Sequence, residues 1–293
     1  MFFIETHLPT IISDLRVLHE YRQLVKDIII PCNAQVNRCV EQAWQSVRIE
    51  WNKRSLDEII QIRATHNWSP TEYYDLATSI QIAKTLLHCQ YARKEDAKAF
   101  IQQVYAILEK ALPKRNTLAI IGEAGAGKTF FLSTIFTLVW NVCHIESYFD
   151  CKTKFPYKDL LNKRLGVINQ FHLNPRQMAK YKQLFEGNMA ILPRVPILIT
   201  SNNRFMDQLN EMDSIEFEKR MFIHYWQPQP WLKKLYKRLH PLILPHLAKE
   251  SFQNVLSVPQ VVSLAEPNYD TSIYKMLQDL DSDLERDLQL VEC

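Results

Sequence analysis

Residues 122–129 read Gly-Glu-Ala-Gly-Ala-Gly-Lys-Thr, which matches the phosphate-binding pattern G-x-x-x-x-G-K-[ST]. The short apolar run 117–121 before it predicts a buried strand, and the run 130–140 after it, free of Gly and Pro, predicts a helix. Strand, glycine-rich loop and helix in that order are the setting in which this pattern forms a P-loop. The stretch therefore predicts an α/β fold that binds a nucleotide.

Each residue type in this loop has a chemical reason to be there. Glycines let the backbone turn its N–H groups toward phosphate, and the following helix adds partial positive charge at its N-terminus. We expect Lys128 to reach the β- and γ-phosphates of ATP and the Thr129 hydroxyl to bind Mg²⁺. The residues predicted to bind the cofactor share this one loop: Gly122, Gly125, Ala126, Gly127, Lys128 and Thr129.

Composition bounds the class of protein. The 293 residues are 47% hydrophobic and 23% charged, as in globular chains of one or two domains. No run reaches 18 uninterrupted apolar residues, so we expect no membrane span, and the first residues lack the features of a secretory signal. The six cysteines form no C-x-x-C pair and no zinc-spaced cluster, which favours an intracellular setting.

Charge is distributed unevenly along the chain. Residues 266–293 hold eight acidic and two basic residues, net −6, so the rest of the chain carries net +9 within the overall +3. A mildly basic body with an acidic tail is typical of nucleic-acid-binding proteins, although a solvated surface of mixed charge would have the same composition. In the tail, Leu277, Leu280, Leu284 and Leu288 form an apolar stripe for which core packing is the simplest interpretation.

The remaining pattern predicts three regions. Residues 1–112 contain no glycine and show helical apolar spacing, with 69–72 (Ser-Pro-Thr-Glu) as a predicted helix start. Residues 113–230 form the predicted P-loop core, with further strands at 165–168, 196–200 and 221–225 that indicate a parallel sheet. Residues 231–293 form a predicted helical region that is first basic and then acidic.

Five short elements, in this order and spacing, resemble the superfamily 3 helicase domain of parvovirus large non-structural (Rep-type) proteins. They are the K-R-N-T run 114–117, the P-loop, the F-P-Y-K-D run 155–159, the apolar strand 196–202 ending in Ser-Asn, and the R-M-F run 220–222. The resemblance covers about residues 113–226. It implies an AAA+-type ATP-dependent DNA helicase that works in viral DNA replication in the nucleus and assembles as a ring of identical subunits around DNA.

The resemblance also implies roles for two residues outside the loop. Asn202 would orient the attacking water against the γ-phosphate, and Arg220 would reach into the ATP site of a neighbouring subunit. Simpler interpretations remain for both: a helix cap for Asn202 and a surface salt bridge for Arg220.

The chain departs from the family where hydrolysis is carried out. The Walker B strand of the family ends in two acidic residues, and the corresponding positions here are the neutral amides Asn169 and Gln170. An amide keeps the shape of a carboxylate but loses the charge that would hold Mg²⁺ and activate water. We therefore expect nucleotide binding to survive and hydrolysis to be impaired.

Two further departures concern DNA. The stretch 188–195 is shorter than the DNA-gripping hairpin of the family, and Arg194 is its only basic residue. The nine histidines include no H-x-H pair, so we expect no origin-nicking activity. These features predict weak, non-specific binding of single-stranded or viral DNA without efficient unwinding.

Two functions remain open at this point. The first is an ATP-dependent DNA helicase or its ATPase core. The second is a catalytically degenerate relative of viral origin that binds ATP and oligomerises or binds a partner. A nucleoside kinase that shares only the P-loop is disfavoured, since such an enzyme does not need the K-R-N-T, F-P-Y-K-D and Ser-Asn elements.

Overall fold

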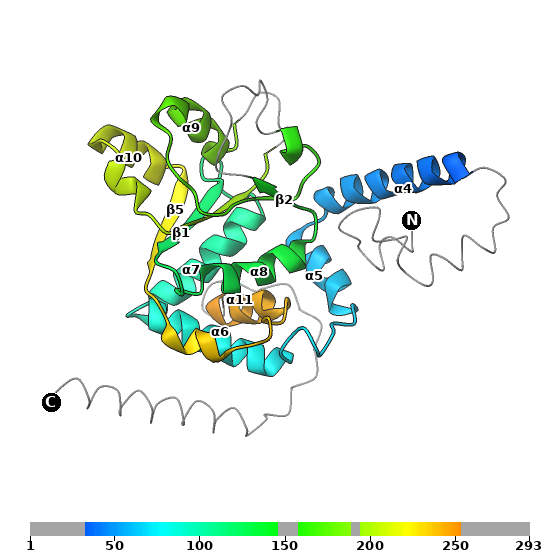
Figure 1. The fold of residues 1–293 in the computed structure, drawn as a ribbon, viewed down its shortest axis with the longest axis horizontal. Coiled ribbons are helices and arrows are strands. Elements are labelled where there is room, and N and C mark those ends of the chain that lie inside the picture. Colours follow the sequence, from blue (N-terminus) through cyan, green and yellow to red (C-terminus); the bar gives the residue numbers. More distant parts are fainter. Residues whose placement is uncertain (1–32, 146–157, 189–193, 253–293) are drawn as a thin grey trace.

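A parallel sheet of five strands forms the centre of the computed structural model, which describes residues 33–145, 158–188 and 194–252 (Figure 1). The strand order is β2-β3-β4-β1-β5, and all neighbours run parallel. The strands are β1 (Thr117–Gly122), β2 (Val142–Ile145), β3 (Leu165–Ile168), β4 (Ile197–Ser201) and β5 (Met221–Trp226).

Strand β1 lies inside the sheet because its side chains are apolar on both faces, as central parallel strands require. Leu118 and Ile120 face one hydrophobic cluster, while Ala119 and Ile121 face another, following the two-residue period of a strand. Ile121 is in register with Ser201 of β4 and Tyr225 of β5. The carboxyl ends of these three strands therefore meet at one edge of the sheet.

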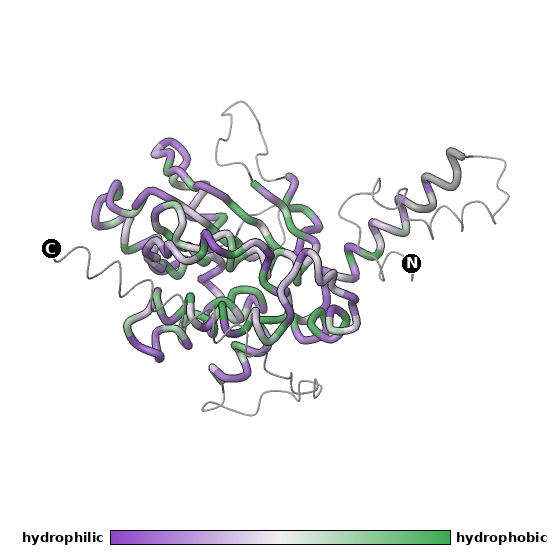
Figure 2. The backbone as a smooth tube through the Cα atoms, turned by 60° about the horizontal axis from the view of Figure 1, so that its bottom comes forward, coloured by the Kyte–Doolittle hydropathy of each residue, from purple (hydrophilic) through white to green (hydrophobic). Residues whose placement is uncertain are grey.

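Helices cover both faces of the sheet (Figure 1). The cluster on the Leu118 face includes residues of α6 (Leu76–Gln90), α7 (Lys94–Leu108), α8 (Lys128–Val139) and α11 (Ile243–Phe252). The opposite face is covered by α9 (Met178–Glu186) and α10 (Glu211–Glu218). Figure 2 shows hydrophobic stretches running through the interior and hydrophilic ones in the outer turns.

Among the described residues, two helices precede α6 in the chain. They are α4 (Asn33–Lys53), which extends away from the sheet in Figure 1, and α5 (Leu56–Ala64). Trp51 anchors the end of α4, because its indole Nε1 donates to the carbonyl of Val139 at 2.7 Å and its ring meets that of Trp140 edge-on. Ser55 caps α5 in a reciprocal capping box with Glu58.

The predicted α/β fold with a parallel P-loop sheet is confirmed, and the four strands expected from the sequence are β1, β3, β4 and β5. Strand β2 was not predicted. Its residues continue the apolar run of α8, and the helix ends without Gly or Pro, at Trp140 with φ 63°. Because no residue type marks the end of α8, the sequence does not indicate that a fifth strand follows it.

The predicted helix start at 69–72 is wrong. Those residues form a turn closed by a hydrogen bond from Tyr73 N to Ser69 O, and α6 begins at Leu76. Asp75 caps that helix by accepting from the Thr78 amide at 2.9 Å.

Some of the sequence-based predictions concern residues that the structure does not describe. The leucine stripe of the tail and residues 1–32 are outside the described ranges. The boundaries of the three predicted regions stay predictions. Within the described ranges, helices do form before the P-loop strand and again at α11. None of the described helices is long and apolar enough to cross a membrane.

Candidate nucleotide-binding site

The P-loop connects the carboxyl end of β1 to the first turn of α8, which begins at Lys128. Gly125 and Gly127 have φ angles of 84° and 83°, in the left-handed region that favours glycine. The space beside Gly125 is open, whereas a side chain at Gly127 would meet Leu86 and Leu232. The loop therefore has one face open for a ligand and one face packed against the protein.

Gly122 is needed for a different reason. A Cβ at this position would collide with the carbonyl oxygen of Trp226 on β5, because the two backbones approach closely there. This contact brings the end of β5 directly against the P-loop.

Lys128 points its ammonium group back into the loop. Nζ donates to the carbonyl of Gly122, to the carbonyl of Glu123 at 2.8 Å and to Oδ1 of Asn202 at 3.0 Å. The residue is 7% exposed, and burial lowers the pKa of its ammonium group. A cation is thus held at the centre of the loop by three oxygen acceptors that an incoming phosphate can replace.

Asn202 reaches Lys128 because it directly follows β4, the strand beside β1. Thr129 lies on the exposed surface in the first turn of α8, so its hydroxyl is accessible to a ligand. The fold therefore brings Asn202 together with the predicted loop residues 122–129, although 74 positions separate Asn202 from Lys128.

Two glutamines support the loop from outside. The Gln90 Nε2 atom, at the end of α6, donates to the carbonyl of Ala126 at 3.2 Å. The backbone N–H of Gln229 donates to the carbonyl of Gly125 at 3.0 Å. Gln90 also pairs with both backbone groups of Gln227. Sequence reasoning missed these residues, because their partners are backbone carbonyls distant in sequence and no motif marks them.

Asn169 and Gln170 follow β3, so they lie at the same edge of the sheet as the P-loop, with β4 in between. The Oδ1 atom of Asn169 accepts from the Thr200 hydroxyl at 3.3 Å, and Gln170 has a left-handed φ of 53°. Both residues are exposed. Both residues thus directly follow a strand of the sheet, and neither can supply a negative charge.

Two carboxylates that could in principle replace the missing acid lie elsewhere. Glu186 ends α9 and pairs with Arg220, which precedes β5 at the opposite edge of the sheet. Asp159 lies beside the start of β2. A third candidate, Glu146, is outside the described residues. Within the described ranges, no group of three or more His, Cys, Asp or Glu residues is arranged to hold a metal.

Arg220 is not brought to its own P-loop. It precedes the first residue of β5, whereas the P-loop follows the last residue of the neighbouring β1, a strand that spans about 20 Å. Its Nε donates to Glu186 at 3.3 Å, and its Nη1 donates to the carbonyl of Glu216 at 2.7 Å. Within one subunit Arg220 therefore forms salt bridges, and any contact with ATP would have to be made in a neighbouring subunit.

Arg194, the basic residue of the short stretch 188–195, is engaged in holding the fold. Its guanidinium donates to the carbonyls of Lys110, Leu112 and Arg115 and to Oδ1 of Asn116. Asn116 is itself buried and donates from Nδ2 to the carbonyl of Val195 at 2.6 Å. The charged guanidinium of Arg194 thus makes structural hydrogen bonds near the amino ends of β1 and β4.

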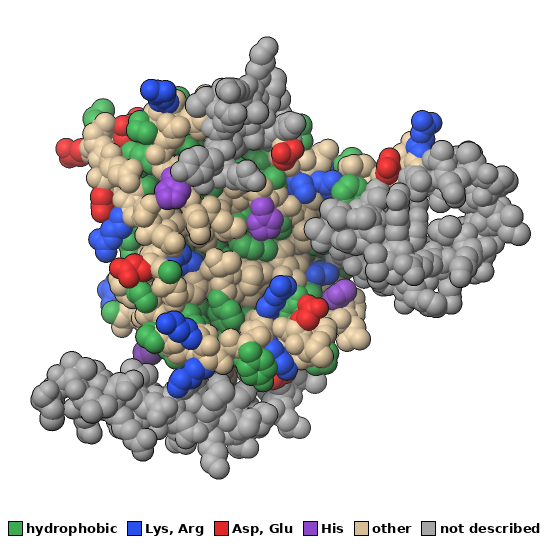
Figure 3. All heavy atoms as spheres, in the orientation of Figure 1, with side chains coloured by type: hydrophobic (Ala, Val, Ile, Leu, Met, Phe, Trp, Pro, Cys, Tyr) green, Lys and Arg blue, Asp and Glu red, His purple; other side chains and the backbone are tan. Residues whose placement is uncertain are grey.

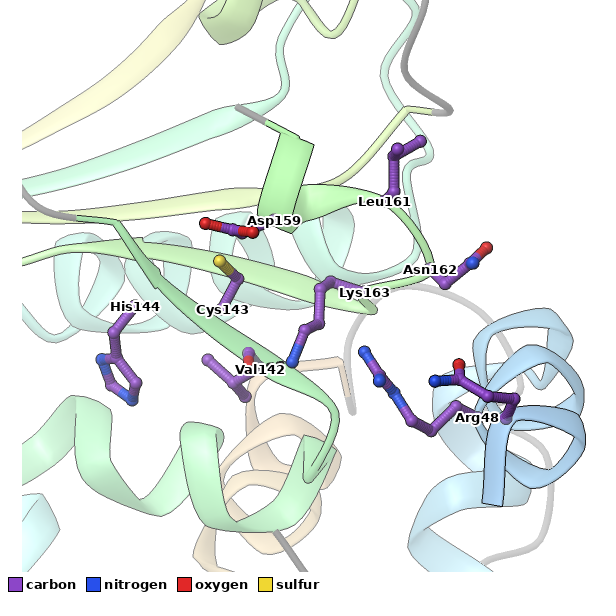
Figure 4. Close-up of a pocket in the computed structure, with 9 residues that line it drawn as sticks. Arg48, Val142, Cys143, His144, Asp159, Leu161, Asn162 and Lys163 are labelled. Carbon is purple, nitrogen blue, oxygen red and sulfur yellow. Dashed lines mark hydrogen bonds between the residues drawn. The ribbon is translucent and has the colours of Figure 1, made fainter. Parts of the chain in front are cut away.

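A separate pocket of about 500 Å³ lies beside β2 (Figure 4). Arg48 and Lys163 enter it from α4 and from the turn before β3, and burial lowers the pKa of both side chains. Arg48 Nε donates to Asn141 Oδ1 at 3.1 Å, and Lys163 Nζ donates to the carbonyl of Val142 at 3.0 Å. The Arg48 contact ties α4 to the residue before β2, and the Lys163 contact ties the turn before β3 to β2.

Comparison with known proteins points to one family. Residues 81–215 match the family model for the parvovirus non-structural protein NS1. The chain contains a parvovirus NS1-like domain. This range includes the P-loop, the two amides and Asn202, and it ends shortly before Arg220.

Individual relatives of the NS1-like domain agree with this assignment. "Initiator protein NS1" of Bombyx mori densovirus is 30% identical over 204 residues, which are 63% of this chain and 22% of that protein. The protein of the same name from Diatraea saccharalis densovirus is 25% identical over 185 residues, 59% of this chain and 33% of that protein. The chain thus spans between about a fifth and a third of the length of these relatives.

Among solved structures, that of JCV helicase aligns with a TM-score of 0.47 at 11% identity. The alignment covers 71% of this chain and 66% of the JCV helicase chain.

Proposed function

We propose that the NS1-like domain binds ATP together with Mg²⁺ at the P-loop and hydrolyses it slowly. The observation that carries this proposal is the Lys128 ammonium group, held between the loop carbonyls and Asn202 at the carboxyl ends of β1 and β4. A buried cation with replaceable oxygen partners, beside an open glycine backbone, has the chemistry that phosphate binding requires.

In this proposal each residue of the site has a separate role in binding ATP or Mg²⁺ or in orienting water. The backbone N–H groups from Gly125 to Gly127 surround the phosphates, and Lys128 turns from its carbonyl partners to the β- and γ-oxygens. The exposed Thr129 hydroxyl holds Mg²⁺, whose charge offsets that of the phosphates. Release of Lys128 frees the Asn202 side-chain oxygen to orient a water molecule against the γ-phosphate.

Slow hydrolysis follows from Asn169 and Gln170. Neither side chain can accept a proton from the attacking water, and loss of a general base typically reduces a rate by about 10²–10⁴-fold. Binding suffers less, because it depends mainly on the loop backbone and Lys128.

In the same proposal the protein assembles through its ATP sites as a ring in the nucleus and binds single-stranded DNA weakly. The viral relatives are named "Initiator protein NS1", and this name supports a function that involves DNA. The engagement of Arg194 in backbone contacts supports binding without efficient unwinding, since no other basic residue of the stretch 188–195 can grip a strand.

A second candidate function is an ATP-controlled binding protein with no useful turnover. The neutral pair Asn169 and Gln170 favours it, because ATP would then remain bound and hold one assembled state. Measured turnover separates this candidate from a slow ATPase.

The binding proposal is tested by titrating a fluorescent ATP analogue into the wild-type protein, Lys128→Ala and Lys163→Ala in the presence of Mg²⁺. Lys163 is a matched control, because burial also lowers the pKa of this lysine, yet it lies beside β2, away from the P-loop. We expect Lys128→Ala to abolish binding and Lys163→Ala to retain it, with thermal unfolding showing that both variants fold. Equal affinity of Lys128→Ala and wild type would overturn the proposal.

A further inference from the structure

Between β5 and α11 the chain exposes an aromatic ring among basic side chains. Tyr236 is 83% exposed, and its ring centroid lies 5.7 Å from that of Tyr74, which precedes α6. The Lys237 ammonium lies 5.7 Å from the Tyr236 ring centroid and 6.0 Å from that of Tyr74. We call these residues, together with the exposed Lys233, Lys234 and Arg238, the aromatic–basic patch.

Hydrogen bonds connect the backbone beneath the patch to the segment before α6. Tyr74 N donates to Arg238 O at 2.9 Å, and Arg238 N donates to Glu72 O at 2.9 Å. Tyr236 N donates to the Tyr74 hydroxyl at 3.2 Å. Two segments distant in sequence therefore pair like short strands, and this pairing fixes where the Tyr236 ring stands.

Lys237 is also fixed in place, because its Nζ donates to the carbonyl of Pro70 at 2.9 Å. The patch carries four cationic side chains, and the exposed Glu72 and Asp75 beside it reduce the local charge to net +2. Figure 3 shows Lys and Arg side chains with hydrophobic ones between them over the lower part of the molecule, where this segment runs in Figure 1.

Core packing does not explain this arrangement. The Tyr236 ring contributes little buried area, and a large aromatic side chain gains most of its free energy when it is removed from water. A fixed, exposed ring beside cations is instead the arrangement on which a nucleic-acid base can stack while its phosphates are neutralised.

We propose that the aromatic–basic patch binds single-stranded DNA, with one base stacked on Tyr236 and the adjoining phosphates against Lys237 and its neighbouring cations. The proposal rests on the DNA binding proposed above and adds its location. That location adjoins the ATP site, because Leu232 of the same segment packs beside Gly127 of the P-loop. Stacking on a tyrosine tolerates any base, so we expect no sequence preference.

The test uses fluorescence anisotropy with a labelled oligo(dT) strand across a salt series, on the whole chain. Replacing a stacking aromatic residue by alanine typically weakens binding by roughly fivefold or more. We expect Tyr236→Ala to show that loss and Tyr236→Phe to retain affinity. Lys237→Ala should lower the steepness of the salt dependence, because fewer counterions are then released on binding.

Tyr225→Ala is the matched control. Tyr225 is also exposed and lies beside a cation, with the Arg204 guanidinium 5.4 Å from its ring centroid, but it is outside the patch. We expect its removal to leave DNA affinity unchanged. A strand carrying 5-iodouracil should photocross-link to Tyr236, which peptide mapping would detect.

The outcomes separate the patch from the ATP site. If wild-type protein binds DNA and Tyr236→Ala binds it equally well, the proposal that the patch is the binding site is wrong, while the proposed DNA binding itself is supported. If wild-type protein binds the ATP analogue but not DNA, the patch and the DNA role fall and the ATP site stands. If Tyr236→Ala loses the ATP analogue and keeps DNA, the ring contacts the nucleotide base instead, and the proposal is wrong.

Discussion

At the residue scale, His224 on β5 shows how burial fixes a protonation state. Its Nε2 lies 2.9 Å from Gln103 Oε1, which can only accept, so Nε2 carries the hydrogen. Its Nδ1 then accepts from the Tyr91 hydroxyl at 3.0 Å, and the Tyr91 oxygen accepts from Trp226 Nε1 at 3.1 Å. Burial lowers the pKa of His224 to about 4, so the ring is neutral in this network.

This lowered pKa predicts a loss of stability in acid. An unfolded histidine titrates near 6.5, so between pH 6.5 and 4 the unfolded state binds more protons than the folded state. The stabilisation is present above pH 6.5 and is lost as the pH falls toward 4, by at most about 3 kcal/mol for this group. Urea unfolding at several pH values measures it.

The His224→Gln variant isolates the contribution of His224. Burial also lowers the pKa of His240 to about 4, so the variant should have a shallower dependence of stability on pH rather than none. The same slope in the variant and the wild type would show that His224 is not the titrating group.

From residue identity alone, residues of the proposed ATP site could be predicted only where they belong to one contiguous motif. The loop residues and Lys128 follow from the spacing of one motif, whereas Asn202 was predicted from the family resemblance, in which the apolar strand 196–202 ends in Ser-Asn. The roles of Gln90 and Arg194 could not be predicted, because both side chains donate to backbone carbonyls. Every residue has a backbone carbonyl, so the residue type of the partner gives no signal in the sequence. Their roles appear only when α6 and the stretch before β4 are folded against the P-loop strand.

At the scale of elements, Arg194 holds the segment that precedes β1 by hydrogen bonds. Four acceptors from Lys110 to Asn116 converge on one guanidinium, and the chain after Arg194 leads directly into β4. Burial lowers the pKa of Arg194. An arginine side chain stays protonated in proteins. The side chain therefore acts as a charged clamp between the segment before β1 and the segment before β4.

We therefore expect Arg194→Ala to affect stability rather than DNA binding. Loss of hydrogen bonds to a charged group costs about 1.5–3 kcal/mol, and the carbonyls left behind lose their partner. Chemical denaturation should show that decrease, whereas the exposed Lys114→Ala nearby should change it little. A variant of normal stability that has lost DNA affinity would instead assign Arg194 to strand binding.

The elements themselves were predictable to the extent that their ends carry a signal. Strands β1, β3, β4 and β5 are apolar runs separated from their neighbours by polar residues or Pro. The boundary between α8 and β2 depends on the left-handed Trp140, whose ring packs against Trp51, so a tertiary contact rather than a turn residue ends the helix. The start of α6 was misplaced because Pro70 marks a turn that precedes the true cap, Asp75.

At the scale of the whole molecule, the sheet separates the two halves of the proposed ATP machinery. The P-loop and Asn202 lie at the carboxyl edge, while Arg220 lies at the amino edge. The helix before Arg220, α10, exposes Met212 at 76% and Ile215 at 44%. An apolar helix face beside an arginine is suited to contact with a second copy of the chain.

This separation predicts ATP-dependent assembly. Light scattering with a non-hydrolysable ATP analogue should show a larger species than the apo protein, and Arg220→Ala should weaken that response. Arg220→Lys keeps the charge but loses the planar guanidinium, so we expect it to restore only part of the effect. A protein that stays monomeric at all nucleotide concentrations would exclude a role for Arg220 in a neighbouring site.

The central claim is that the P-loop site of the NS1-like domain binds ATP but lacks the carboxylate that hydrolysis needs. Steady-state ATP hydrolysis, measured with and without single-stranded DNA, tests it most directly when wild type, Lys128→Ala and Gln170→Glu are compared. We predict a slow wild-type rate, none for Lys128→Ala and a faster rate for Gln170→Glu, which restores the negative charge after β3. A robust wild-type rate that Lys128→Ala abolishes and Gln170→Glu does not raise would contradict the account, because another group would then activate the water.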